Sequence, residues 1–238
     1  MNRRAGRQRQ GRQGARERSR SDLLQPVDRP SDSDPRIISP VNDRLRIGPD
    51  GVIRCWWPGD DPLYMAYHDD EWGYPVTDDR ALFQKISLDA FQAGLAWITI
   101  LRKREAFREA FQGFDIEAVA SYDSEDVERL LANPGIIRHK GKIEATIANA
   151  RLALGMIDEF GSLTEYLRRF SPTPGPAPTY DIPAVTEESK ALSADLRSRG
   201  WRFVGPTVIY AFMQAVGMTN DHLDGCSIRP AVEAERLR

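Results

Sequence analysis

The chain has 238 residues, of which 41% are hydrophobic and 29% are charged, and it contains two cysteines. This length is sufficient for one domain with a sizeable core, and so few cysteines exclude a small secreted scaffold held by several disulfides. The N-terminus lacks the apolar segment of a signal peptide, which favours a cytoplasmic location.

The charge is unevenly distributed along the chain. Residues 1–50 contain 12 arginines and seven acidic residues, whereas residues 51–238 contain 21 basic and 28 acidic residues. The first 20 residues carry eight of these arginines and no large apolar side chain after Met1, so they cannot offset the entropy lost on ordering. We therefore expect residues 1–50 to form a disordered tail and linker. It either adds salt-dependent attraction to nucleic acid or is a passive extension.

Helix signals dominate the rest of the chain, and strand signals are scarce. Thr77 is placed to cap a helix whose apolar residues recur at helical spacing until Gly94. A second helix is expected over residues 97–111, ended by Gly113, and a shorter one begins at Asp123. These segments predict a helical first half of the domain.

The second half of the chain has the same character. A long amphipathic helix follows a basic turn, and Ser162 caps the helix after it. A proline-rich crossing loop over residues 171–183 separates these helices from one that begins at Thr186. Pro206 suits the first turn of the last apolar helix, which lies in the longest uncharged run, residues 203–220. The glycine, proline and polar residues of that run argue against a membrane span.

The pattern as a whole favours a single all-α domain. Seven or eight helices are expected, and no fixed-period repeat is present. We place the domain at residues 51–230 and expect a short C-terminal tail over residues 231–238. No separate apolar patch or coiled-coil heptad is evident, so a monomer is expected.

Four residues near the two ends of the domain could hold a metal. They are Cys55, His68, His222 and Cys226. Two thiolates and two imidazoles make a closed tetrahedral zinc site of the structural kind, because no position is left for water. Such a site would connect the two ends of the domain. The spacing is not that of a standard zinc motif, so inert buried cysteines and ordinary histidines are the alternative.

A second group of residues is aromatic and includes one unusual acid. Four of the five tryptophans lie between residues 56 and 97. The aromatic candidates are Trp57, Tyr64, Tyr67, Trp72 and Trp97. They form either an aromatic core or a pocket that sandwiches a planar ligand. Asp89 stands in an apolar stretch, where a carboxylate must pair, stay protonated or face a cavity, so it is the first candidate for binding a cationic group.

Two turns are candidates for binding phosphate. The first turn enters a helix and carries four potentially cationic side chains, Arg138, His139, Lys140 and Lys142. The second, which contains Gly205 and Thr207, has the pattern of a helix–hairpin–helix turn. Free backbone N–H groups at helix starts favour an anion, and a local basic patch on an acidic body points to a nucleic acid backbone. Each turn alone is also compatible with a solvated helix start.

Several motifs occur in one order over about residues 53–229. They are Cys55-Trp-Trp57, Asp61 to Gly73, Gln92-Ala-Gly-Leu-Ala-Trp97-Ile-Thr, Gly135 to Ile143, and Asn220-Asp-His222 with Cys226. Together they closely resemble the DNA-3-methyladenine glycosylase I family, a zinc-containing branch of the helix–hairpin–helix DNA glycosylases. The first 50 residues have no counterpart in the family pattern.

This resemblance implies a helix–hairpin–helix glycosylase fold and a structural zinc ion. The four zinc positions of the family correspond to Cys55, His68, His222 and Cys226. The resemblance also implies a pocket for a base flipped out of alkylated double-stranded DNA, lined by Tyr64, Tyr67, Trp72 and Trp97, with Trp57 nearby. The implied reaction is hydrolysis of the N-glycosidic bond of 3-methyladenine.

Asp89 departs from the family pattern. The family has a glutamate at this position, which hydrogen-bonds the alkylated adenine, so the resemblance makes Asp89 the catalytic acid that contacts the base. Its side chain is one methylene shorter, and the adjacent family glycine is Ala90 here. Two alternatives therefore remain: a glycosylase for a bulkier N3-alkyl purine, and a zinc-stapled module that binds lesions without turnover.

The expected reaction is hydrolysis without strand cleavage. Many relatives with the same hairpin carry a catalytic aspartate just past its second helix, where this chain has Asp221 next to His222. If His222 binds zinc, we expect Asp221 only to support it. The lyase position beside the hairpin holds no lysine, since residues 205–207 read Gly-Pro-Thr. These residues predict a monofunctional enzyme that leaves an abasic site.

Overall fold

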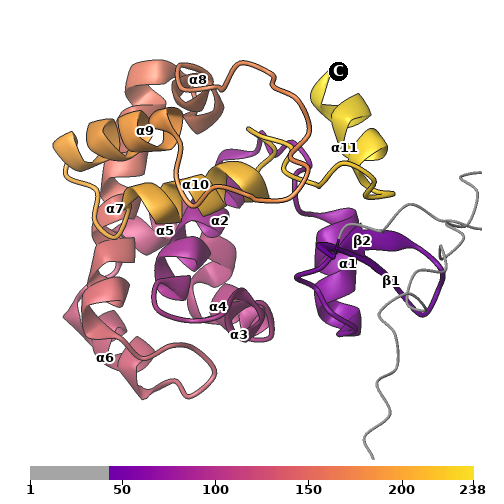
Figure 1. Ribbon diagram of the computed structural model, residues 1–238. Helices are drawn as coiled ribbons and strands as arrows, with labels where there is room; N and C mark the ends of the chain where they lie inside the picture. Colours follow the sequence, from indigo (N-terminus) through magenta and orange to yellow (C-terminus); the bar gives the residue numbers. More distant parts are fainter. Residues whose placement is uncertain (1–42) are drawn as a thin grey trace, which may run out of the picture. The chain divides into compact units, whose positions relative to one another are not determined.

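The structure is a computed structural model that describes residues 43–238. The disorder expected over residues 1–42 therefore falls outside the described residues. Within the described part, the chain forms eleven α-helices, one short 3-10 helix and one two-stranded sheet (Figure 1). The expected all-α fold is confirmed, with this small sheet as an addition. No helix in residues 43–238 is long and apolar enough to cross a membrane.

The elements follow one another closely along the chain. The strands are β1 (Leu45–Ile47) and β2 (Ile53–Cys55). The first half contains α1 (Pro62–Asp70), α2 (Asp79–Gln92), α3 (Trp97–Leu101), α4 (Arg104–Ala110), the 3-10 helix (Gln112–Phe114), α5 (Ile116–Ser121) and α6 (Ser124–Ala132). The second half contains α7 (Lys140–Phe160), α8 (Leu163–Arg168), α9 (Glu187–Ser198), α10 (Pro206–Ala215) and α11 (Arg229–Arg236).

The expected linker ends earlier than residue 50. Strand β1 pairs with β2 in antiparallel register, with Leu45 opposite Cys55. The turn between the strands contains Pro-Asp-Gly, in which Gly51 has a φ of +78° and Asp50 accepts a hydrogen bond from the N–H of Val52 at 3.1 Å. Pro-Asp-Gly between apolar residues is a turn signal, which the composition of this segment obscured.

The helix expected over residues 97–111 is divided. Lys103 has φ −100° and ψ 0°, outside the helical region, so α3 and α4 are separate helices. Its ammonium group donates to the carbonyls of Pro134 and Gly135 at 3.2 and 3.1 Å. The N-cap of α2 is Asp78, whose carboxylate accepts from the N–H of Ala81, and not Thr77 as expected. This division, together with α5 and α11, explains why the helices exceed the expected number.

The C-terminal residues do not form the expected tail. Helix α11 includes most of residues 231–238, and Val232 is completely buried. Arg229 donates to the carbonyls of Asn220 and His222 at 2.7 and 2.6 Å, and Arg236 donates to the carbonyl of Gly217 at 2.9 Å. The helix is therefore held by one apolar side chain and by arginines that donate to backbone carbonyls of the preceding segment.

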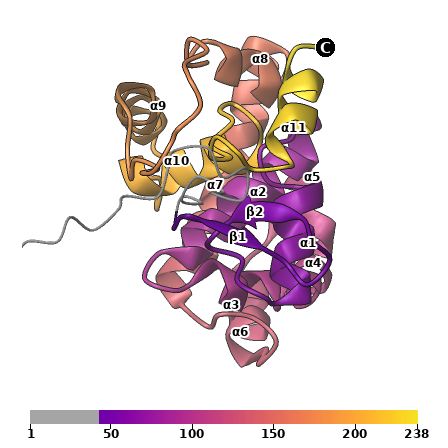
Figure 2. The ribbon, with the colours of Figure 1, turned by 45° about the vertical axis from the view of Figure 1, so that its right-hand side comes forward.

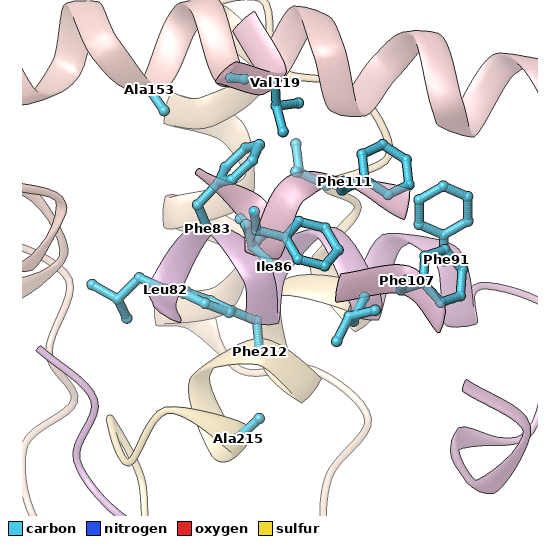
Figure 3. Packing of buried hydrophobic residues seen from close by; sticks show 14 of the residues in the cluster. Leu82, Phe83, Ile86, Phe91, Phe107, Phe111, Val119, Ala153, Phe212 and Ala215 are labelled. Carbon is cyan, nitrogen blue, oxygen red and sulfur yellow. The ribbon is translucent and has the colours of Figure 1, made fainter. Parts of the chain in front are cut away.

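Helix α2 lies at the centre of the core and fixes the position of the candidate acid. It contacts α3, α7, α8 and α10. Figure 3 shows α2 between Phe212 of α10 on one side and Ala153 of α7 on the other. Phe91 of α2 packs against Phe107 at a ring-centroid distance of 4.7 Å. Because both faces of α2 are packed, the side chains near its C-terminal end have a rigid support.

The hairpin predicted around residues 200–207 is present between α9 and α10, which contact each other (Figure 2). Phe203 adopts a φ of +57°, a left-handed conformation that is uncommon for a large side chain. Asn149 of α7 donates to the carbonyl of Arg202 and accepts from its N–H, both at 3.0 Å. The hairpin is thereby anchored to α7 through its backbone.

Gly217 is a position at which a larger residue is excluded. Its φ is +75°, and an added Cβ would lie 2.6 Å from backbone atoms of Tyr74 and Pro75. We predict that Gly217→Ala lowers the free energy of unfolding by at least about 2 kcal/mol, because backbone must move. Gly155→Ala is the matched control: it lies inside α7 with open space around it, and alanine should stabilise it by about 0.5–1 kcal/mol. Urea unfolding of both variants measures this, and equal effects would contradict the close approach.

Candidate functional site

The predicted aromatic residues and the predicted acid line one cavity of about 290 Å³. These residues are Trp57, Tyr64, Tyr67, Trp72, Asp89 and Trp97. Five further residues, which were not predicted to line the pocket, complete the cavity: Trp56, Gln92, Ile182, Ala211 and Gln214. A cavity of this size with a mainly apolar lining and few polar groups is typical of a small-molecule site.

Helix α1 and the segments around it bring the aromatic rings together. The ring of Trp57 lies 4.9 Å from that of Tyr64 and 5.0 Å from that of Trp72. Tyr67 lies 5.3 Å from Trp97, the first residue of α3. Asp61 caps α1 by accepting from the N–H of Tyr64 at 3.1 Å. The rings are held in tilted and edge-on pairs, which leaves ring faces available to a planar ligand.

Two polar atoms at the cavity have no hydrogen-bond partner among the residues that the structure describes. They are Oδ2 of Asp89 and Nε1 of Trp97, both completely buried. One is an acceptor when ionised and the other is a donor. Buried polar groups are nearly always hydrogen-bonded, and an unsatisfied one is costly. Because both residues line the cavity, a ligand with a donor and an acceptor on one edge would satisfy both.

Burial controls the charge of Asp89. It is 3% exposed, and desolvation raises the pKa of its carboxyl to about 7. The attraction of Lys85, one helical turn earlier on α2, opposes this shift. Burial lowers the pKa of Lys85, whose ammonium lies 3.6 Å from Glu71 and 5.4 Å from the ring centre of Tyr67. A carboxyl with a pKa near neutrality in a cavity is typical of a functional acid.

The four predicted metal ligands form a second buried cluster. The donor atoms of Cys55, His68, His222 and Cys226 all lie within 4.8 Å of one another. The sulfur of Cys226 lies 3.5 Å from Nδ1 of His222 and 3.8 Å from Nε2 of His68. A hydrogen bond from Cys55 lowers the pKa of Cys226, which favours the thiolate form that metals bind. The cluster could therefore hold a metal ion.

In both histidines of the cluster, the ring nitrogen that faces away from the cysteines makes a hydrogen bond that orients the ring. Nδ1 of His68 donates to the carboxylate of Asp69 at 2.7 Å, and Arg54 donates to the same carboxylate at 2.6–2.9 Å. Nε2 of His222 donates to the carbonyl of Trp72 at 3.0 Å. Each ring thus turns its other nitrogen toward the cysteines, the arrangement usual for histidines that bind metals.

Asp221 does not support His222 as the sequence analysis expected. Its carboxylate accepts from Tyr210 at 2.5 Å, from Gln214 at 2.7 Å and from Thr219 at 3.0 Å. The imidazole of His222 binds the backbone of Trp72 instead. Asp221 therefore connects the end of α10 to the loop before Cys226.

Arg138, His139 and Lys140 are exposed beside the hairpin, as a contact with DNA requires. The ring of His139 lies 6.0 Å from that of Phe203, so the basic turn adjoins the hairpin. Gly205 and Thr207 stand at the N-terminus of α10, with Thr207 exposed.

The prediction that Lys142 contacts phosphate is wrong. Its ammonium is buried and donates to the carbonyls of Phe91 and Ala93 at 2.9 and 2.8 Å, where α2 ends. A cation at a helix C-terminus donates hydrogen bonds to free carbonyls and interacts favourably with the helix dipole. Lys142 therefore supports the end of α2 and is not available to DNA, whereas Arg202, which the sequence analysis did not select, is exposed in the hairpin.

The titration of Asp89 gives a testable prediction about stability. Because the folded-state pKa is raised to about 7 from 3.8, the stability that Asp89 contributes is present below about pH 4 and is lost as the pH rises to about 7. The free energy of unfolding of wild type, relative to Asp89→Asn, should fall by roughly 2–4 kcal/mol over that range and then level off. Urea unfolding across pH, with the exposed Asp158→Asn as control, measures this difference. A difference that does not vary with pH would contradict a buried, unpaired carboxyl.

Several known proteins are similar to this chain in sequence and in fold. The family model for methyladenine glycosylase matches residues 57–229. The DNA-3-methyladenine glycosylase 1 of Escherichia coli is 49% identical over 181 residues, which covers 74% of this chain and 97% of that protein. The DNA-3-methyladenine glycosylase of Haemophilus influenzae is 43% identical over 179 residues, with 74% and 97% covered.

Solved structures agree with these sequence matches. A crystal structure of 3-methyladenine DNA glycosylase I superposes with a TM-score of 0.72 at 49% identity and covers 74% of this chain and 100% of that one. A structure of the Staphylococcus aureus enzyme, which describes its recognition of 3-methyladenine, gives a TM-score of 0.69 at 36% identity, with 71% and 93% covered. The chain therefore belongs to the methyladenine glycosylase family.

Proposed function

We propose that the chain is a DNA repair glycosylase that hydrolyses the N-glycosidic bond of 3-methyladenine in alkylated double-stranded DNA. The observation that carries this proposal is that Oδ2 of Asp89 and Nε1 of Trp97, both buried at one aromatic cavity, have no hydrogen-bond partner within residues 43–238. A purine carries donors and acceptors on one edge and a flat face on each side. The cavity offers matching groups for both.

Selection of the damaged base follows from charge. An adenine alkylated at N3 in DNA is cationic and leaves its sugar easily, so no strong general acid is needed. Ring faces at Tyr67 and Trp97 supply stacking and cation–π attraction of about 0.5–2 kcal/mol each, and Asp89 accepts a hydrogen bond from the exocyclic amine or a ring N–H. A neutral adenine gains less from both. Weaker pairing of the damaged base also lowers the cost of flipping it.

The DNA backbone would bind at the hairpin and the adjacent basic turn. Arg138, His139 and Lys140 are exposed there, and the N-terminus of α10 presents free backbone N–H groups near Thr207. Residues 51–238 carry a net charge of −7, so a local cationic patch directs the duplex to this face. These contacts position the duplex, while the pocket selects the base.

Hydrolysis without strand cleavage follows from the residues beside the hairpin. No lysine stands at residues 205–207, so an amine that could form a Schiff base with the sugar is absent from that position. Asp221 is occupied by three hydrogen bonds and is not free to activate water. We infer that the product is an abasic site.

We infer that the metal is a structural Zn²⁺ held by Cys55, His68, His222 and Cys226. Two thiolates and two imidazoles in a buried cluster suit zinc and leave no position for water, so the ion contributes stability and takes no part in the reaction. Trp57 lies 5.1 Å from the ring of His68, so loss of the ion would disturb the pocket wall.

A different N3-alkyl purine is the second candidate substrate. The side chain of Asp89 is one methylene shorter than the glutamate expected from the resemblance, which leaves more room in the cavity. We further infer a cytoplasmic location, since Cys55 and Cys226 are free thiols, as is usual in a reducing compartment. We also infer a monomer, since the large apolar side chains exposed within residues 43–238 are few and come from different segments: Ile47, Leu63, Leu95, Tyr180 and Leu237.

The reaction and its acid are tested by release of free base from methylated duplex DNA. Wild type should release 3-methyladenine, and Asp89→Asn should reduce kcat/KM at least about 100-fold, which corresponds to about 2.7 kcal/mol of lost transition-state stabilisation. Asp158→Asn removes one exposed negative charge on α7 and should leave the rate unchanged. Chromatography identifies the released base, and a larger alkylpurine as the preferred product would favour the second candidate.

Two results would contradict the proposal. A folded wild type that binds methylated DNA but releases no base would be a lesion-binding module. Strand scission at neutral pH without added base would contradict the monofunctional mechanism.

The metal prediction uses the chain's third histidine as a control. Purified protein should contain one zinc per chain, and His222→Ala should lose it and melt more than about 10 °C lower, because metal binding contributes to folding. His139→Ala removes a histidine outside the cluster and should retain the metal. Metal analysis and thermal melting measure this. Full metal content in His222→Ala would contradict the ligand assignment.

A further inference from the structure

The segment ahead of the family match contributes a wall to the pocket. The family model begins at residue 57, whereas Trp56 lines the cavity. The N–H of Trp56 donates to the carbonyl of Arg44 at 2.9 Å, so strand β1 and its flanking residues hold the backbone of Trp56. Arg44 therefore lies next to a pocket residue, although it does not line the cavity itself.

The guanidinium of Arg44 is stacked between two aromatic rings. It lies 4.7 Å from the ring centre of Trp56 and 4.9 Å from that of Tyr180. It also lies 3.6 Å from the carboxylate of Asp181, and the hydroxyl of Tyr180 donates to Asp43 at 3.3 Å. A planar cation between two ring faces is a directional contact that lysine reproduces poorly.

The contact joins β1 to the crossing loop, residues 171–183. This loop contains no helix or strand, and Figure 1 shows it as the long orange connection between α8 and α9. Near its end, the N–H of Asp224 donates to the carbonyl of Pro178 at 2.8 Å. Ile182, two residues after Tyr180, lines the cavity. The sandwich thus connects Trp56, which lines the cavity, to Tyr180, which lies two residues before the cavity-lining Ile182.

We propose that Arg44 is a positioning residue that clamps the crossing loop against Trp56 and so closes the outer wall of the base pocket. This inference rests on the proposed function, because the ligand is the flipped base. Arg44 contacts the wall and not the base, so it acts on how firmly the base is held. The step in which the glycosidic bond breaks depends on Asp89 and the stacked rings, and it should be unaffected.

The test compares three substitutions in the full chain. Arg44→Ala should raise the Kd for free 3-methyladenine, measured by calorimetry, and the KM for methylated DNA three- to tenfold, with kcat within twofold of wild type. Arg44→Lys keeps the charge beside Asp181 but not the stacking, so its Kd and KM should lie between those of wild type and those of Arg44→Ala. Arg46→Ala is the matched control, since Arg46 lies two residues later, in β1, and pairs with Asp60 at 2.9 Å, and it should match wild type.

The free base separates the clamp from a contact with DNA. It carries no phosphate, so a higher KM for DNA with an unchanged Kd for free base would overturn the clamp. Equal Kd values for Arg44→Ala and Arg46→Ala would overturn it as well. If Arg44→Ala fails to fold, Tyr180→Ala tests the same sandwich from an exposed position, and an unchanged Kd in that variant would be equally contradictory.

The same measurements distinguish failure of the clamp from failure of the proposed function. A wild type that binds free 3-methyladenine but releases none from DNA contradicts the reaction, and the Kd values of the variants still decide the clamp. A wild type that neither binds nor releases the base overturns both. Normal release by wild type with no effect of Arg44→Ala overturns the clamp alone.

Discussion

The site depends on the burial of the Asp89 carboxyl group, whose Oδ2 has no hydrogen-bond partner among residues 43–238. Asp89 is held at the cavity because α2 is packed on both faces, so the side chain cannot turn toward solvent. Desolvation raises its pKa to about 7, and Lys85 limits that rise. A cation in the cavity would reverse this cost, since an opposite charge favours the ionised carboxylate. The same burial that destabilises the empty pocket therefore favours a cationic planar ligand over a neutral one.

The metal cluster and the pocket are directly connected. Trp72 lines the cavity, and its carbonyl accepts from the ring of His222. Cys55 at the end of β2 and Cys226 in the loop before α11 are held together in the cluster, and the N–H of Ser227 donates to the carbonyl of Ile53 at 2.9 Å. Figures 1 and 2 show the C-terminal segment beside β2 accordingly. A metal bound here would stabilise the side of the pocket formed by β2, α1 and the loop that contains His222 and Cys226.

Residue chemistry predicted more of the site than of its supports. The four candidate metal ligands, the pocket aromatics and Asp89 are candidates by residue type, and the resemblance to the family favours metal binding and a pocket over inert cysteines and an aromatic core. Lys142 could not be assigned, since its sequence neighbours are basic and only the fold shows that its ammonium reaches the end of α2. Ile182 was missed for a similar reason, because a proline-rich loop gives no signal of what it covers. The predicted helix boundary was wrong at Lys103, where the backbone leaves the helical region and the side chain donates to the carbonyl of Pro134, a residue distant in sequence.

The most direct test is a crystal structure of the protein with free 3-methyladenine bound. The account predicts the base in the cavity, stacked on the aromatic rings that line it, with Oδ2 of Asp89 and Nε1 of Trp97 each within about 2.7–3.2 Å of a polar atom of the base. Both atoms would then have the hydrogen-bond partners that they lack in the described part of the chain. A base bound elsewhere, or one that leaves Asp89 without a hydrogen bond, would contradict the role assigned to the buried carboxylate.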